Sequence, residues 1–172
     1  MILDVKFLDL NTGFVCAASS NDLELSNAAI LRTEDGGATW TEVYRSGRPL
    51  ELCWKMSFPS SRVGFATVQN NDDSNVSQRV IKTTDSGITW RELPFAEDAE
   101  MRELGIGFLT ERHGWVGTSK GGYETRDGGR SWRAVDIGQS VNKIRFLRHD
   151  RGFTAFAIGT TVMRLDGDQV EA

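Results

Sequence analysis

The sequence predicts an all-β protein, a β-propeller of about four four-stranded antiparallel blades. Three observations carry this prediction. A pattern of an aromatic residue, five further residues, glycine and a second aromatic residue recurs four times, at intervals of 51, 50 and 38 residues. A motif of the form Ser/Thr-x-Asp-x-Gly-x-Ser/Thr-Trp follows each of the first three copies. The stretches around these motifs alternate apolar and polar residues, as half-buried strands do.

Each repeat divides into four predicted strands. The first strand ends at the first aromatic residue, and five turn-forming residues lead to a second strand that begins at the glycine. The third strand precedes the aspartate motif, and the fourth carries its tryptophan. Because so small a sheet cannot bury both faces alone, the blades must stack around an axis. We therefore expect one propeller domain over residues 1–172, with blades at about 1–48, 49–99, 100–138 and 139–172.

The aspartate motif reads as turn chemistry rather than as an acidic site. Its carboxylate can accept backbone N–H groups across a tight turn, its glycine permits a positive φ, and its tryptophan can bury a large apolar area. The motif residues expected to build the hairpins between third and fourth strands are Asp35, Gly37, Thr39, Trp40, Asp85, Gly87, Thr89, Trp90, Asp127, Gly129, Ser131 and Trp132. A fourth copy near Asp166-Gly167 is degenerate, with Val170 and Glu171 at the Ser/Thr and Trp positions.

These residues resemble the Asp-box, or BNR, repeat of sialidases, other glycoside hydrolases, sortilin-like receptors and photosystem II assembly factors. The run T-x-D-G-G-x-[ST]-W after F-x5-G-[FW], with nothing else appended, is most similar to the photosystem II assembly-factor family and its bacterial relatives. The resemblance covers essentially the whole chain. It implies a non-enzymatic assembly chaperone with an Arg-rich surface patch, although no arginine of this chain is matched to that patch.

The number of blades leaves three arrangements open, because the resemblance implies about seven and the chain supplies about four. The chain could form a compact four-bladed ring, a homodimer whose halves close one larger ring, or part of a longer chain that supplies the missing blades.

Composition narrows the function classes. The hydrophobic share of 39% suits a folded domain, and the net charge of −4 does not favour nucleic acid. No apolar run is long enough to span a membrane, and no signal peptide is visible, so we expect a cytoplasmic protein or the mature form or fragment of an exported one. Cys16 and Cys53 lack metal-ligand spacing; buried free thiols are expected, with a disulfide as the alternative. We expect no cofactor.

The sequence gives little indication of an enzyme active site. There is no Arg-Ile-Pro motif, the tyrosines Tyr44 and Tyr123 fall on predicted outer strands, and no two carboxylates are singled out as a facing pair. His113 and His149 fall in turns and are expected at the surface. We therefore expect a non-enzymatic scaffold that binds a protein or peptide. The alternative is a piece of a sialidase-like BNR-repeat glycoside hydrolase or carbohydrate-binding protein, with a glycan as ligand.

Two surfaces are candidates for binding. The segments between second and third strands are long and polar in the first two repeats, and loops on one face of a rigid scaffold often carry function, although tolerated insertions look the same. The candidate residues there are Asn21, Asp22, Glu24, Asn71, Asp72, Asp73 and Asn75. No metal site is predicted, because the stretch NNDDSN lacks the glycine and distal glutamate of a calcium-binding EF-hand loop. The second candidate is a basic mouth of the central channel, formed on the innermost strands by Lys6, Lys55, Lys143 and Arg145.

Overall fold

The computed structural model describes residues 1–98 and 100–168, except for the side chains of residues 103 and 104. This part of the chain forms fifteen strands and a single 3-10 turn, Leu23–Leu25. No helix in it has the length and apolar character needed to cross a membrane.

The strands form four antiparallel sheets, here called blades 1 to 4, in which strands lie in chain order. Blade 1 comprises β1 (Ile2–Phe7), β2 (Gly13–Ala18), β3 (Ala28–Thr33) and β4 (Thr41–Arg45). Blade 2 comprises β5 (Glu51–Ser57), β6 (Gly64–Asn70), β7 (Ser77–Thr83) and β8 (Arg91–Glu97). Blade 3 comprises β9 (Glu103–Phe108), β10 (Gly114–Thr118), β11 (Gly122–Thr125) and β12 (Arg133–Val135). Blade 4 has β13 (Lys143–His149), β14 (Gly152–Ile158) and β15 (Val162–Gly167). The predicted all-β propeller architecture is confirmed, with three strands in the described part of blade 4.

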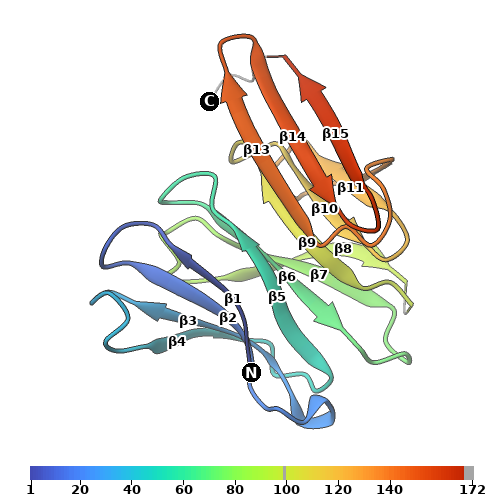
Figure 1. Ribbon diagram of the computed structural model, residues 1–172. Helices are drawn as coiled ribbons and strands as arrows, with labels where there is room; N and C mark the ends of the chain where they lie inside the picture. Colours follow the sequence, from blue (N-terminus) through green and yellow to red (C-terminus); the bar gives the residue numbers. More distant parts are fainter. Residues whose placement is uncertain (99, 169–172) are drawn as a thin grey trace.

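The blades follow one another in an arc, with blade 1 in blue and blade 4 in red at its opposite ends (Figure 1). The first strand of each blade is innermost, so that β1 contacts β5, β5 contacts β9 and β9 contacts β13. The arrangement is therefore a partial propeller rather than a closed four-bladed ring.

The hydrophobic core lies between neighbouring blades. The second strands β2 and β10 are buried along their whole length. In β2, Val15 and Ala17 on the face away from blade 2 pack with Ala29 and Leu31 of the same sheet. Between blades 1 and 2, Phe14, Cys16 and Ile30 pack against Cys53 and Met56. Both cysteines are buried free thiols, as expected, and their sulfur atoms lie 2.7 Å apart across the blade boundary. Burial raises the pKa of the Cys16 thiol.

The degenerate fourth motif has a different register from the expected one. Phe153 pairs with Gly167, whereas the corresponding Phe14 pairs with Arg32, the residue just before the first motif. The motif's first position in blade 4 is therefore Asp168, and Asp166 precedes the motif instead of supplying its aspartate. Val170 and Glu171 lie outside the described residues.

Candidate functional site

Each of the three complete Asp-box motifs closes a hairpin between the third and fourth strands of its blade. In blade 2, Asp85 Oδ1 accepts the Thr89 N–H at 3.0 Å and the Thr83 hydroxyl at 2.7 Å, while Oδ2 accepts the Thr89 hydroxyl at 2.6 Å. Asp35 and Asp127 make the equivalent bonds in blades 1 and 3. The motif glycines have positive φ, with values of 94°, 74° and 85° at Gly37, Gly87 and Gly129. These carboxylates are thus engaged in the turns.

The hydrogen bonds predict a loss of stability in acid. The hydroxyl and N–H of Thr89 lower the pKa of Asp85 from 3.8 to about 2, and Thr39 does the same for Asp35. Because the folded pKa lies below the unfolded one, this stabilisation is complete above pH 3.8 and disappears as the pH falls towards 2. We expect Asp85→Asn to show a smaller drop in melting temperature across that interval than the unchanged chain. Parallel curves in thermal melts would contradict this assignment.

The motif tryptophans differ in burial, which corrects the expectation that each buries a large area. Trp90 makes edge contacts with Phe14 and Phe58, and Trp132 does so with Phe108. Trp40 remains 36% exposed, and its one ring contact within the described residues is with Phe7. The physical reason is its position: no blade covers that side of blade 1.

The first candidate loop is anchored at its base and exposed at its tip. Asp22 accepts the Glu24 N–H at 3.1 Å and so caps the 3-10 turn Leu23–Leu25. At the base, the buried Ser26 donates to the Glu51 carbonyl at 3.1 Å. Asn21, Asp22 and Glu24 are all exposed.

The second candidate loop uses most of its polar groups within the protein. Asn71 donates through its backbone and side chain to the Leu50 carbonyl, at 2.8 and 3.1 Å. Three further residues accept hydrogen bonds: Asp72 from Ser74, Asp73 from Arg102 and Asn75 from Ser77. Both loops lie on the face that carries the connections between blades. Their acidic groups do not come together in a common site.

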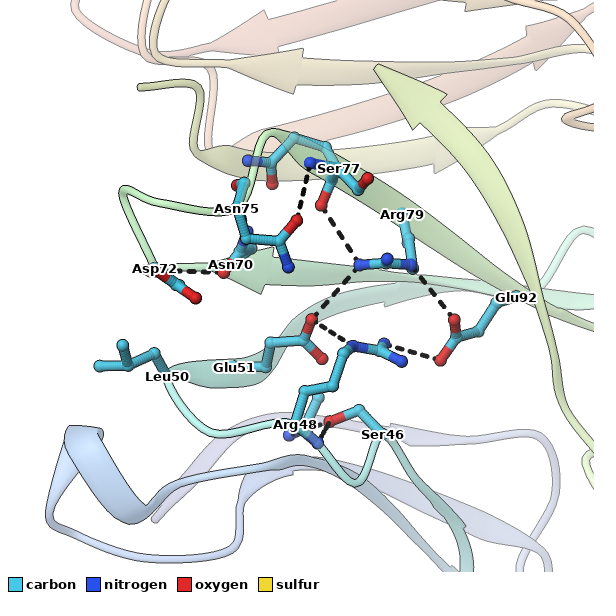
Figure 2. A network of polar contacts seen from close by, with 12 residues as sticks. Ser46, Arg48, Leu50, Glu51, Asn70, Asp72, Asn75, Ser77, Arg79 and Glu92 are labelled. Atoms are coloured by element: carbon cyan, nitrogen blue, oxygen red, sulfur yellow. Dashed lines mark hydrogen bonds and ion pairs between the residues drawn. The ribbon is translucent and has the colours of Figure 1, made fainter. Parts of the chain in front are cut away.

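A charged network that sequence reasoning missed joins blades 1 and 2 (Figure 2). Glu51, which is 1% exposed, accepts from Arg48 at 2.7 Å and lies 3.5 Å from Arg79. Glu92 pairs with the same arginines at 2.7 and 3.3 Å and accepts the Tyr44 hydroxyl at 2.8 Å. Although burial opposes its ionisation, Arg48 and Tyr44 hold the pKa of Glu92 below its usual value. The carboxylates and guanidinium groups neutralise one another, although Glu51 Oε2 is buried without a hydrogen-bond partner among the described residues. The network is a structural joint between the two blades.

The predicted basic residues all line one hollow. The inner strands β1, β5, β9 and β13 enclose a space of about 720 Å³, and its lining includes Lys6, Lys55, Lys143 and Arg145. We call this space the basic hollow. Among the described side chains that line it, the one acidic group is Asp4, which accepts the Met56 N–H at 3.1 Å.

The cations of the basic hollow differ in whether they bind other groups of the protein. Lys55 donates to the Leu3 carbonyl at 3.0 Å and lies 5.5 Å from the centre of the Trp54 ring. Within the described chain, the exposed side chains of Lys6, Lys143 and Arg145 have no hydrogen bond or ion pair.

Aromatic side chains also line the basic hollow, and the sequence had not singled out one of them, Trp54. The indole N–H of Trp54 is buried and has no acceptor among the described residues. Phe58 and Phe146 belong to the repeat pattern and line the same space. Trp54 lies outside both motifs, so only its place on an innermost strand could have indicated it.

His113 is buried, which corrects the expectation of a surface residue. Its Nε2 lies 2.8 Å from Glu124, and the same buried carboxylate binds Arg126 and Arg133. Burial lowers the pKa of His113, so the ring is neutral at neutral pH. His113 is buried because strand pairing brings Glu124 opposite the turn that contains it. His149 is exposed, as expected.

No family model matches the chain. Over 147 residues, or 85% of its length, the chain is 29% identical to the photosystem II assembly lipoprotein Ycf48 of Synechococcus sp. (strain CC9902), and the match covers 40% of that protein. A solved structure of YCF48 bound to D1 peptide aligns with a TM-score of 0.64 at 22% identity, over 98% of this chain and 52% of that chain. An ancestral GH74 enzyme aligns with a TM-score of 0.60 at 15% identity, over 98% and 26%.

The chain thus spans about half, or less, of the length of the proteins it matches. The solved structures support the propeller fold. The chain is therefore a partial β-propeller with three complete Asp-box hairpins, similar in sequence to the photosystem II assembly lipoprotein Ycf48 and in fold to the solved YCF48 and GH74 structures.

Proposed function

We propose that this chain is a non-enzymatic scaffold that binds an extended, carboxylate-bearing segment of a partner protein in the basic hollow. One observation carries the proposal. The molecule as a whole has a net charge of −4, yet the described side chains that line the basic hollow include four cations and one anion. Such a concentration of positive charge in a recess attracts and orients acidic groups.

The size and lining of the basic hollow support a peptide ligand. Its volume of about 720 Å³ is within the usual range of ligand pockets. Lys143 and Arg145 are two residues apart on β13, and their charges have no competing partner within the described chain. Trp54 adds an aromatic surface and an indole N–H without an acceptor in the described part of the chain, which suits a carbonyl or carboxylate oxygen.

The comparisons support an assembly role for such binding. The curated relative is a photosystem II assembly lipoprotein, and a solved relative is a complex with D1 peptide. By analogy, we propose that this chain holds a segment of a protein during its assembly into a larger complex. The basic hollow is preferred to the two candidate loops because Asn71, Asp73 and Asn75 already bind neighbouring parts of the chain.

Replacing the free cations is expected to weaken acidic-peptide binding. Lys143→Glu combined with Arg145→Glu should raise the Kd for a fluorescent Asp/Glu-rich peptide by about tenfold or more, since it removes two charge-assisted contacts. Fluorescence anisotropy at low salt measures this, with a basic peptide as ligand control. The matched protein control is Arg91→Glu with Arg130→Glu, which changes two exposed arginines on Asp-box hairpins by the same charge.

Two outcomes would overturn the proposal. One is equal peptide affinity for the β13 variant and the hairpin control. The other is loss of peptide binding in a Glu24→Lys variant of the first loop, while the β13 variant binds the peptide as tightly as the unchanged chain. Turnover of a fluorogenic glycoside panel would refute its non-enzymatic part.

A further inference from the structure

Cys16 and Cys53 face each other across the boundary between blades 1 and 2. Cys16 lies on β2 and Cys53 on β5, 37 positions further along the chain. Both side chains are fully buried, and their sulfur atoms are 2.7 Å apart. Since the sulfur–sulfur bond of a disulfide measures about 2.05 Å, a movement of less than about 1 Å brings the two atoms to bonding distance. The fold therefore places the two thiols where a disulfide between blades can form.

The strands beside this pair are irregular. In β1 the pairing with β2 shifts register between Ile2 and Asp4, and in β5 the pairing with β6 shifts between Cys53 and Met56. Cys16 lies opposite Asp4, so each cysteine adjoins one of the two bulges. A bulge disrupts the regular hydrogen-bond ladder, so contacts other than strand pairing must hold its residues in place.

The two bulges contact each other and line the basic hollow. The Lys55 ammonium group donates to the Leu3 carbonyl at 3.0 Å, and the Met56 N–H donates to the Asp4 carboxylate at 3.1 Å. Asp4, Lys55 and Met56 line the hollow together with Trp54, the residue next to the cysteine of β5. A covalent bond between the two cysteines would therefore join the blades at the wall of the basic hollow.

We propose that Cys16 and Cys53 are a redox-sensitive pair whose disulfide, formed with a small organic disulfide as oxidant, locks blade 1 to blade 2 and fixes this wall. One cysteine thiolate attacks a sulfur atom of the oxidant, so that a mixed disulfide forms and one small thiolate leaves. The second cysteine thiolate attacks the protein sulfur of the mixed disulfide and expels the other small thiolate. Overall, the two protein thiols lose two electrons and two protons, and the small disulfide becomes two thiols.

Burial determines when this exchange takes place. It raises the pKa of the Cys16 thiol, and the hydrogen bond with Cys53 raises it further, so the closed junction contains little thiolate. The exchange therefore takes place during folding or a transient opening of the junction, before the two sulfur atoms are enclosed. The same burial then shields the disulfide from reductants.

Refolding in a glutathione redox buffer tests whether the bond forms. The full chain is refolded from urea in mixtures of reduced and oxidised glutathione, remaining thiols are alkylated with iodoacetamide in denaturant, and the intact mass is measured without reductant. Because the chain has two cysteines, a monomer with neither alkyl group nor glutathione carries the bond between them. We expect this species at an oxidised-glutathione concentration lower by roughly tenfold or more than the chain kept in urea requires, because the fold holds the sulfur atoms together.

The matched control keeps two buried thiols but separates them. Cys53→Ala with Val116→Cys moves the second thiol to β10 of blade 3, a fully buried position in a different core cluster from Cys16. Both thiols of this variant should be alkylated after refolding in buffers that oxidise the unchanged chain. A refolded chain that is no more readily oxidised than the chain in urea, or than this control, would overturn the proposal.

The effect of the bond is measured on the oxidised and reduced forms of the unchanged chain. The oxidised form should melt at a temperature higher by roughly 10 °C, because a cross-link over 37 positions restricts the unfolded chain. Hydrogen exchange of the Met56 N–H, which joins the two bulges, should slow several-fold. The Gly128 N–H, bonded to the Arg112 carbonyl in blade 3, is the internal control and should change less.

Two results would contradict these effects. A disulfide that leaves the melting temperature unchanged, or lowers it, would show that the bond does not lock the blades. Equal exchange of the Met56 N–H in the two forms would show that the wall is not fixed by it. None of these measurements uses a peptide ligand, so they stand apart from the peptide-binding proposal.

Discussion

Trp90→Ala is expected to lower the free energy of unfolding by about 3–5 kcal/mol. The indole ring packs against Phe58 of its own blade and Phe14 of blade 1, so its loss opens a cavity at a junction between blades. Urea unfolding followed by circular dichroism measures the change.

Two matched variants separate burial from turn chemistry. Trp40→Ala removes the same side chain from the same motif position, but its ring is partly exposed, so we expect a loss of about 1–2 kcal/mol. Asp85→Ala should also cost about 1–2 kcal/mol, as the loss of a capping side chain does. If Trp40→Ala matched Trp90→Ala, or if Asp85→Ala exceeded it, the packing assignment would be wrong.

Glu51→Ala is expected to cost about 3 kcal/mol, at the lower end of the range for breaking a buried ion pair, because Arg48 and Arg79 keep Glu92 as a partner but lose the buried carboxylate between them. The side chain is 1% exposed, and both Arg48 and Arg79 depend on it at the joint between blades 1 and 2. The same urea unfolding experiment measures this loss. Glu51→Gln keeps an acceptor at that place and should cost less than the alanine variant.

An exposed ion pair provides the control for this prediction. Glu42 pairs with Arg45 on β4, and the two side chains are 37% and 46% exposed. Since surface pairs contribute about 0–1 kcal/mol, Glu42→Ala should change stability little. Equal losses for Glu51→Ala and Glu42→Ala would show that the charged joint is not important to the fold.

Much of the fold could be predicted because its signals are local. Alternating residues around Phe7, Phe58 and Phe108 indicated the first strands, and each Asp-box specified a hairpin by hydrogen bonds within eight residues. The candidate basic residues were found in the same way, as the polar alternates on three of the innermost strands. Their gathering around one hollow followed from the stacking order of the blades.

Contacts between distant segments could not be predicted from those signals. His113 was expected at the surface, yet strand pairing buries it against Glu124. Glu51 looks like an ordinary strand residue, and only the packing of blade 1 on blade 2 makes it a buried anion between two arginines. The polar loops offered binding residues in isolation, but Leu50 and Arg102 engage Asn71 and Asp73.

Trp40 and Trp90 show the difference between what local sequence determines and what depends on contacts between distant segments. The amino-acid sequence by itself determined the repeats, the four blades and the Asp-box turns, because those depend on hydrogen bonds and alternation among neighbouring residues. Only the tertiary structure decided which motif residues are buried and which form surfaces. Two tryptophans in the same motif differ because burial depends on the neighbouring blade, and blade 1 is covered on one side alone.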